Sequence, residues 1–337
     1  MGFLKYTSLL VASCTVVLAL LPRQNSKFVP LVNKRYKYED IPYRVDTDVG
    51  LARGEQVGYN ICNSTTQGPS SLCQTAIFNS VQDFCIWAPP KAGEEVGAIE
   101  GEMVAWCTRG GHGTRVMPAG TITGVQWTTT PDYIQAVGFM DQTKINMLKG
   151  DSGGEMDPHG ADLRGNPMGG LIYTNAWTAN GSYTQVVEWH NFNGADMFCL
   201  KACDPRTAPR DAKLCEHIYD TQGCGFNAPS NARPGVFESC LGDSQAPPGQ
   251  GVAVPASSSC TTYASTALYD ASATASAGSS TPPATTNTAS GSSPSSQVTG
   301  SGRSSPAPTP TSGALGLSSV FAGLGVSIVG GVLAVFL

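Results

Sequence analysis

Charged side chains are scarce in this chain. Asp, Glu, Lys and Arg make up 13% of its 337 residues, whereas roughly a quarter is usual in soluble proteins. The formal net charge is only −5 and forms no large block of one sign, which argues against nucleic-acid binding through a basic face. The sequence also lacks an internal repeat and an amphipathic helical pattern long enough for a coiled coil. Its 41% of hydrophobic residues is still enough for a folded core.

The first residues predict export from the cell. Residues 1–21 carry a single basic residue, Lys5, ahead of an uncharged apolar run. This run is shorter than the roughly 20 apolar residues that span a bilayer and is typical of a secretory signal peptide. No small-x-small cleavage site follows, so Ala19 is our candidate for the residue before the cut. Residues 22–35 end at a Lys-Arg pair and would be a propeptide if a processing protease cleaves after that pair. The alternative is that the pair is merely exposed and uncleaved.

The other end predicts a glycosylated stalk and a lipid anchor. Residues 251–312 consist mainly of Ser, Thr, Ala, Pro and Gly, a composition typical of disordered, O-glycosylated stalks. Residues 313–337 form an uncharged apolar tail with no Lys or Arg behind it. Small residues, a polar spacer and such a tail match a glycosylphosphatidylinositol (GPI) signal, with Gly300 as the expected acceptor and Ser301 or Ser304 as alternatives. The alternative for the tail itself is a membrane-spanning helix.

An even number of cysteines remains once the signal peptide is removed. Cys14 leaves with that peptide, so ten of the eleven cysteines are retained. In an exported chain this number predicts a disulfide framework of up to five bridges, whose pairing the sequence leaves open. The ten are Cys62, Cys73, Cys85, Cys107, Cys199, Cys203, Cys215, Cys224, Cys240 and Cys260.

Two sequons predict N-linked glycans. Asn63 and Asn180 each begin an Asn-x-Ser/Thr triplet, the acceptor sequence for N-glycosylation, which places both on exposed loops. Because Cys62 directly precedes the first sequon, we expect a loop there that a disulfide closes at its base.

What remains for folding is residues 36–250, the size of a single domain. Short β-favouring runs alternate there with turns rich in Gly, Pro and Asp, which predicts one mainly β domain, a disulfide-rich sandwich or barrel. The Cys-rich part from 199 to 240 is expected to be irregular, with one short helix around 212–219. The β-favouring runs cover residues 101–107, 121–128, 133–139, 169–174 and 183–189.

Residues 150–154 spell Gly-Asp-Ser-Gly-Gly, the nucleophile motif of trypsin-like serine proteases. In such a hydrolase Ser152 would need a histidine and an acid, for which His112 and Asp132 are the candidates. Only 40 positions separate His112 from Ser152, too few for the barrel that supplies the histidine and the aspartate in that family. A Gly-His-Gly-Thr run at 111–114 resembles subtilases, but their serine motif is absent. We therefore assign no catalytic residue and keep a hydrolase as the alternative.

Two groups of potential metal ligands are present. Cys199 and Cys203 are spaced like zinc ligands, but in an oxidising compartment such thiols are usually consumed by disulfides. Asp157, His159 and Asp162 could bind a hard cation, but a polar loop whose Asp side chains cap turns is the favoured interpretation. We therefore predict no metal site and no other cofactor.

Carbohydrate chemistry offers a further alternative. Trp189 could stack on a sugar ring beside the polar His190, although a tryptophan packed in the core is the commoner arrangement. Glu155 and Glu188 could act as a glycosidase pair, but the sequence does not set their separation.

Eight blocks of the predicted domain form a recognisable set. They cover residues 58–67, 73–77, 84–90, 150–154, 157–167, 188–190, 202–205 and 215–220. The set, within a likeness over about residues 45–242, resembles secreted fungal immunoreactive mannoproteins, also called macrophage-activating glycoproteins. The resemblance implies a basidiomycete surface mannoprotein with a mannosylated Ser/Thr stalk. It brings no catalytic residues.

The sequence as a whole predicts a GPI-anchored, mannosylated fungal glycoprotein of the cell wall or the outer face of the plasma membrane, without catalysis. Its expected partners are cell-wall polysaccharides, host mannose-recognising lectin receptors that bind its glycans, and the membrane through the lipid anchor. The alternatives are a secreted serine hydrolase centred on residues 150–154 and a wall-glycan-binding module.

Overall fold

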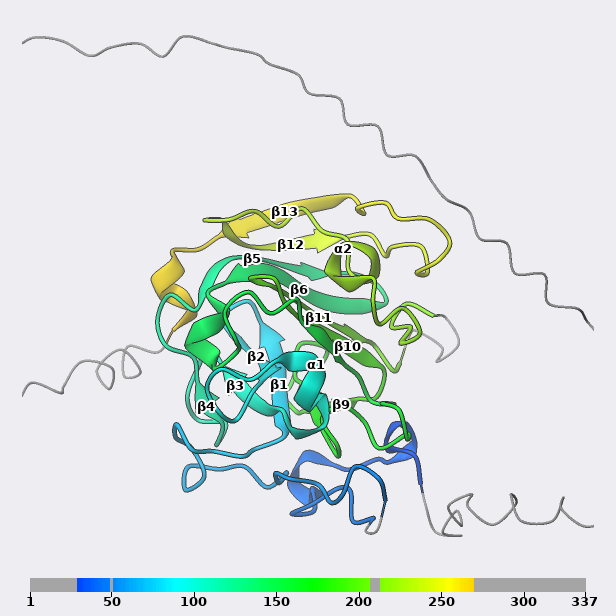
Figure 1. The fold of residues 1–337 in the computed structure, drawn as a ribbon. Helices are drawn as coiled ribbons and strands as arrows, with labels where there is room; N and C mark the ends of the chain where they lie inside the picture. The colour runs from blue at the N-terminus through cyan, green and yellow to red at the C-terminus, as the bar shows by residue number, and fades with distance from the viewer. Residues whose placement is uncertain (1–28, 49–50, 207–212, 270–337) are drawn as a thin grey trace, which may run out of the picture. The chain divides into compact units, whose positions relative to one another are not determined.

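Two mixed β-sheets form the framework of the fold (Figure 1). The computed structural model describes residues 29–48, 51–206 and 213–269. The sheets confirm the prediction of a mainly β, disulfide-rich domain. The predicted signal peptide, Gly300 and the apolar tail lie outside the described residues. No helix within the described ranges combines the length and the apolarity needed to cross a membrane.

The smaller sheet has six strands in the order β4-β3-β2-β1-β8-β9. β1 and β2 form a hairpin, whereas β8 adds to β1 in parallel and β4 adds to β3 in parallel. The strands are β1 (Thr75–Ser80), β2 (Asp83–Ala88), β3 (Val104–Cys107), β4 (Arg115–Val116), β8 (Leu171–Thr174) and β9 (Thr184–Val186).

The larger sheet has seven strands in the order β13-β12-β5-β6-β11-β10-β7. Its centre is the hairpin of β5 and β6, where two of the predicted β-favouring runs flank a turn at Pro131 and Asp132. β12 adds to β5 in parallel. The strands are β5 (Ile122–Thr129), β6 (Tyr133–Met140), β7 (Gly154–Met156), β10 (Trp189–Gly194), β11 (Met197–Cys203), β12 (Phe237–Gly242) and β13 (Ser257–Thr262).

Short helices connect the strands. None is longer than five residues among the described segments, so the helices serve as turns and the sheets supply the framework. The α-helices are α1 (Val96–Ile99) and α2 (Gly223–Asn227); the 3-10 helices are η1 (Leu31–Asn33), η2 (Tyr38–Asp40), η3 (Glu100–Glu102), η4 (Gln142–Ile145) and η6 (Ser265–Leu268).

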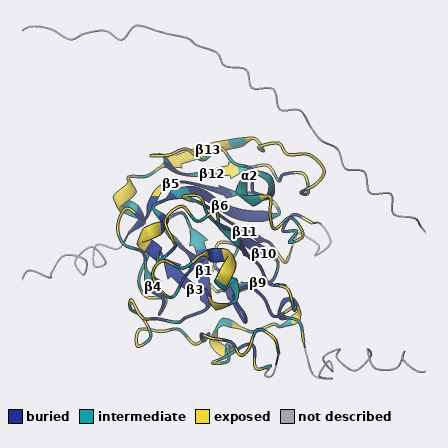
Figure 2. Cartoon of the chain, in the orientation of Figure 1, coloured by how far each residue is buried: buried dark blue, intermediate teal, exposed yellow. Residues whose placement is uncertain are grey.

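Aromatic pairs fill the space between the two sheets. Phe78 on β1 meets Trp127 on β5 with ring centroids 4.5 Å apart, and Trp87 on β2 meets Trp189 on β10 at 4.4 Å. Each such pair contributes about 0.5–1.5 kcal/mol beyond the burial of its area. Figure 2 shows the resulting contrast between dark blue central strands and the exposed outer strand β13.

The ten cysteines from Cys62 to Cys260 all form disulfides. The pairs are Cys62–Cys73, Cys85–Cys107, Cys199–Cys224, Cys203–Cys215 and Cys240–Cys260. The first pair closes the loop that carries Asn63, as expected from the sequence.

The Cys-rich segment 213–232 covers the outer face of the larger sheet. Leu214 packs with Tyr133 of β6 in one small cluster, and Ala228 packs with Val137 of β6 in another. Two disulfides join this segment to β11. The fully buried Lys201 of β11 donates from Nζ to the carbonyl of Asn227 and to Gln245, and burial lowers its pKa.

Two sequence expectations need correction. The helix expected around 212–219 is absent from residues 213–219, which form turns held by the Cys203–Cys215 bridge; the helix of this segment is α2. The folded residues also extend past 250, where we expected the stalk to begin. β13 pairs with β12, and Tyr269 donates its hydroxyl to the carbonyl of Ile122.

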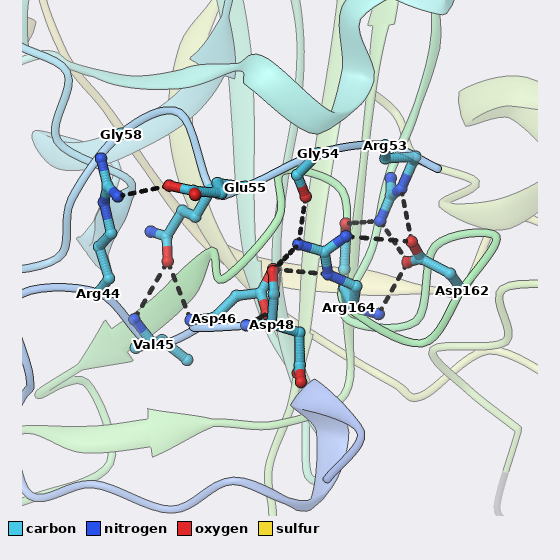
Figure 3. Close-up of polar contacts among 12 residues, drawn as sticks. Arg44, Val45, Asp46, Asp48, Arg53, Gly54, Glu55, Gly58, Asp162 and Arg164 are labelled. Carbon is cyan, nitrogen blue, oxygen red and sulfur yellow. Dashed lines mark hydrogen bonds and ion pairs between the residues drawn. The ribbon is translucent and has the colours of Figure 1, made fainter. Parts of the chain in front are cut away.

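The N-terminal segment is packed against the domain through buried ion pairs (Figure 3). The guanidinium of Arg164 is fully buried and donates to Asp46 (Nε to Oδ2, 2.6 Å) and to the carbonyl of Gly54 (2.6 Å). Arg53 pairs with Asp162 at 2.6 Å. The dibasic pair at 34–35 follows directly on η1, whose Leu31 is buried. Cleavage there stays a prediction.

Candidate functional site

An acidic cavity lies at the β7 edge of the larger sheet. It has a volume of about 810 Å³ and is bounded by β7, the end of β10, the 152–153 loop and residues of the Cys-rich segment. Four carboxyl groups line it, those of Glu100, Glu155, Asp157 and Asp220. None of the described lining residues is Lys or Arg, and His217 is the one described lining residue whose side chain can carry a positive charge.

The pairing of β7 with β10 decides which side chains face the cavity. Met156 of β7 pairs with Asn191, and Glu155 pairs with Phe192. Successive side chains of a strand point to opposite faces. Met156 therefore packs in the core between the sheets, whereas Glu155 and Phe192 line the cavity.

Glu100 reaches the cavity from η3 because Gly154 leaves room for it. A Cβ at Gly154 would collide with Glu100 Oε1. That oxygen accepts the backbone N–H of Glu155 at 3.1 Å, and Oε2 accepts the Asn166 amide at 3.0 Å. Burial, reinforced by the charges of Asp157 and Asp220, raises the pKa of Glu100 to about 7, although the Glu155 N–H and Arg53 oppose the shift.

Glu155 is the most unusual group of the site. It is only 4% exposed, and no nitrogen or hydroxyl donor of the described residues reaches either carboxylate oxygen. Burial raises its pKa to about 10, helped by the charges of Asp157, Asp220 and Glu100 and by a hydrogen bond with the Asp220 side chain. Glu155 is therefore protonated at neutral pH and is the donor to Asp220.

Asp157 is buried directly after β7 and caps a turn. Its Oδ1 accepts the backbone N–H groups of His159 at 2.7 Å and Gly160 at 2.9 Å. Burial raises its pKa, and these two N–H groups oppose that shift. Asp162 faces Arg53 instead, so the two acids considered as cation ligands are directed to different partners.

Disulfides place Asp220 and His217 at the cavity. The Cys203–Cys215 and Cys199–Cys224 bridges hold the segment on both sides of these residues. The ring of His217 stacks on His159 with centroids 3.4 Å apart. His159 in turn contacts Glu188 (Nε2 to Oε2, 3.1 Å). Glu188 is therefore a hydrogen-bond partner of His159, and it does not line the cavity with Glu155.

The structure does not assemble the serine hydrolase candidates. Ser152 lines the acidic cavity, but its hydroxyl makes no hydrogen bond to another described residue. His112 lines a different cavity and contacts Asp83 (Nε2 to Oδ1, 2.6 Å). Asp132 accepts a hydrogen bond from the Ser244 hydroxyl at 2.7 Å. A nucleophile needs a base within hydrogen-bond reach, and none of these contacts supplies one.

The Gly-Asp-Ser-Gly-Gly loop has a structural use. Asp151 accepts the N–H of Val96 at the start of α1 (2.7 Å) and the N–H of Gly153 (3.0 Å). Gly153 has φ +97°, and a Cβ there would collide with the carbonyl of Asn193. These glycines therefore allow the loop to pass against the end of β10.

The hypothesis that Trp189 and His190 bind a sugar is wrong, and the alternative of a tryptophan packed in the core holds. Trp189 is 1% exposed and His190 fully buried, and burial lowers the pKa of His190. Their neighbours Asn191 and Asn193 bind the backbone of Trp87: Asn191 Oδ1 accepts its N–H at 3.1 Å, and Asn193 Nδ2 donates to its carbonyl at 2.5 Å. This stretch of β10 therefore joins the two sheets.

Cys199 and Cys203 cannot serve as zinc ligands, because both are disulfide-bonded. One other group of three potential ligands lies close together within the described residues, Glu238 with Cys240 and Cys260. Those two cysteines are also joined to each other, so the group offers no thiolate.

Both sequons are exposed. The Asn63 side chain accepts a hydrogen bond from the Thr65 hydroxyl at 2.7 Å, and Asn180 accepts one from the Ser182 hydroxyl at 2.8 Å. Each asparagine lies in an exposed stretch of chain, where a glycan would meet no packed neighbour.

Glu100 and Asp220 escaped the sequence analysis. Of the four lining carboxyl groups, Glu155 stood out beforehand as a candidate glycosidase carboxylate and Asp157 as a possible cation ligand. The signal available for the others was weak: a Glu on the turn before β3, and an Asp between two cysteines of the Cys-rich segment.

The fold and the cavity define a disulfide-bonded, two-sheet β protein with a carboxyl-lined site. No family model and no solved structure matches the chain. Appressorium protein ROW2 of Mycosarcoma maydis is 44% identical over 215 residues, which cover 63% of this chain and 71% of that protein. Appressorium protein ROW1 of the same fungus is 51% identical over 196 residues, 58% of this chain and 45% of that protein.

The chain therefore belongs to the family of these fungal appressorium proteins. The relatives agree with the fungal surface protein that the resemblance implied, but they are not named mannoproteins. Membership in the mannoprotein family thus stays a prediction.

Proposed function

We propose that the chain is a GPI-anchored, mannosylated glycoprotein of the fungal cell surface. The observation that carries this proposal is its kinship with two fungal appressorium proteins. An appressorium meets its surroundings through its wall and plasma membrane, so a surface position suits the family. Five disulfides in the described domain support an oxidising, extracellular location.

The glycans would extend from two regions. Asn63 and Asn180 are exposed and suited to N-glycosylation, and the Ser/Thr-rich residues after the described domain supply O-mannosylation sites. Mannans on such a stalk would be the ligands of host mannose-recognising lectin receptors. Contacts with wall polysaccharides would retain the protein in the wall.

Phosphatidylinositol-specific phospholipase C tests the anchor. We expect the enzyme to release the protein from intact cells, and Gly300→Pro, introduced together with Ser301→Pro and Ser304→Pro, to abolish anchoring and send the protein into the medium. Substitution of Ser279, which lies well before the predicted acceptor, is the matched control and should leave release unchanged. Extraction only with detergent, as for an integral membrane protein, would contradict the proposal.

Glycosidase treatment tests the glycans. Peptide N-glycosidase should lower the apparent mass of the wild-type protein, and Asn63→Gln with Asn180→Gln should remove that shift. The remaining excess mass should be sensitive to α-mannosidase. A wild-type protein whose apparent mass α-mannosidase leaves unchanged would refute mannosylation.

A further inference from the structure

We propose that the acidic cavity is a catalytic site that hydrolyses a glycosidic bond. Glu100 is its general acid and Asp220 its general base, and Glu155 is the positioning residue that holds Asp220. This inference goes beyond the proposed surface role and does not depend on the anchor or the glycans.

The partners of the carboxyl groups separate this cavity from the structural acids of the fold. Asp46 and Asp162 are paired with Arg164 and Arg53, as buried or half-buried carboxylates usually are (Figure 3). Glu155 is buried at 4% exposure without any donor of its own. A buried carboxyl group whose one hydrogen-bond partner is a second carboxyl group needs an explanation, and its position in the cavity wall supplies one.

Glu155 explains the orientation of Asp220. As the protonated partner, it donates its hydrogen bond to the Asp220 carboxylate. Asp220 itself is exposed, so its second oxygen is free to meet a water molecule in the cavity. Glu155, by contrast, has no accessible oxygen, which is why we assign it a positioning role.

Glu100 and Asp220 differ in burial and in hydrogen bonding, as a general acid and a general base do. Glu100 is half-buried and held by two hydrogen bonds, and its pKa near 7 keeps it protonated in mildly acidic surroundings. Pairs of carboxyl groups in contrasting environments are the usual acid and base of glycoside hydrolysis. Both groups line the same cavity, so they share one site.

The lining suits a sugar. The N–H of Gly153, a possible oxyanion donor for acyl transfer from a serine nucleophile, is already bound by Asp151. An acetal needs only a proton on its leaving oxygen and a water molecule. The cavity further offers the exposed hydroxyls of Ser152 and Thr221 and the ring of Phe192, which suit a neutral, hydroxyl-rich ligand.

The reaction consumes one water molecule and no cofactor. The proton of Glu100 passes to the glycosidic oxygen as the bond from that oxygen to the anomeric carbon breaks. Asp220 takes a proton from water, whose oxygen forms the new bond to the anomeric carbon. The proton then leaves Asp220 for solvent, and Glu100 regains one from solvent.

Hydrolysis of defined glycans tests the proposal. The purified, folded full chain is incubated with laminarin, chitohexaose and yeast α-mannan between pH 4 and 9, and new reducing ends are measured. We expect hydrolysis of at least one glycan, with a rate that falls about tenfold per pH unit above about pH 7 as Glu100 loses its proton. No product from any of the three, or cleavage of casein alone, overturns the proposal.

Substitutions assign the roles. Glu100→Gln and Asp220→Asn should each lower the rate at least about 100-fold, and Glu102→Gln, an exposed neighbour in η3, is the matched control and should not. For Glu155, the Gln variant keeps a donor for Asp220 and should retain most activity, whereas Glu155→Met should lose it. Undiminished hydrolysis by both the Glu100 and Asp220 variants overturns the assignment, as does equal activity of the two Glu155 variants.

Discussion

The burial of Glu155 makes the stability of the domain depend on pH, and Glu155→Gln should remove the part of that dependence that Glu155 contributes. The ordinary pKa of this side chain is 4.5, whereas the fold raises it to about 10. At pH 7 the unfolded chain is therefore stabilised by ionising Glu155, and the folded chain is not. Because one pH unit corresponds to about 1.36 kcal/mol, this difference lowers the free energy of unfolding by about 3 kcal/mol at pH 7.

Gln has the shape of protonated Glu and donates to Asp220 in the same way. The variant should therefore match the wild type within about 0.5 kcal/mol at pH 4.5 and exceed it by about 3 kcal/mol at pH 7. The sign follows from the raised pKa: the folded chain binds a proton that the unfolded chain releases, so wild-type stability falls as pH rises from 4.5 towards 10.

Guanidinium unfolding at pH 4.5, 5.5, 6.5 and 7.0, with the disulfides intact, measures this difference. The fluorescence of the buried tryptophans, Trp189 among them, reports the transition, and linear extrapolation gives the free energy at each pH. Glu102→Gln, an exposed neighbour of the site, should show no such trend. A difference between Glu155→Gln and wild type that is constant with pH, or smaller at pH 7 than at pH 4.5, would refute the reasoning.

Three more substitutions test the other assignments. Arg164→Met leaves Asp46 buried without its partner and should cost about 3–5 kcal/mol, most of which Asp46→Leu in the same chain should restore, as measured by guanidinium unfolding. Trp189→Ala empties the contact with Trp87 and should cost about 3–5 kcal/mol in the same assay, without changing binding to a glycan array. Ser152→Ala should change stability by less than about 0.5 kcal/mol, and wild type and variant should be equally unlabelled by a fluorophosphonate probe.

The strands could be predicted from the sequence wherever turn residues bounded a β-favouring run at both ends. β5 and β6 follow from two β-favouring runs around Pro131 and Asp132, because such a turn imposes an antiparallel neighbour. The short helix of the Cys-rich segment was misplaced, because disulfides rather than helix propensity decide the path of residues 213–219. The number of disulfides could be predicted, but their pairing depends on strand register, as with Cys85 opposite Cys107.

The site was hidden because it is assembled from distant parts of the chain. Glu100, Glu155 and Asp220 come from a turn, a strand and a disulfide-held segment, and no spacing rule links them. The motifs that did attract notice were local and misleading. Ser152 lies on a loop whose path depends on close backbone contacts of neighbouring glycines. Trp189 and Asn191 are two residues apart on β10 and therefore point to the same side, where Asn191 binds the other sheet.

The spacing of the disulfides has a consequence for biosynthesis. The bridged cysteines are 11, 22, 25, 12 and 20 residues apart, and the only overlap is the nesting of Cys203–Cys215 within Cys199–Cys224. Each pair is complete soon after its second cysteine leaves the ribosome, so oxidation can follow the order of translation. The secretory pathway then has little need to reshuffle bridges, except in the nested pair that holds Asp220 over Glu155.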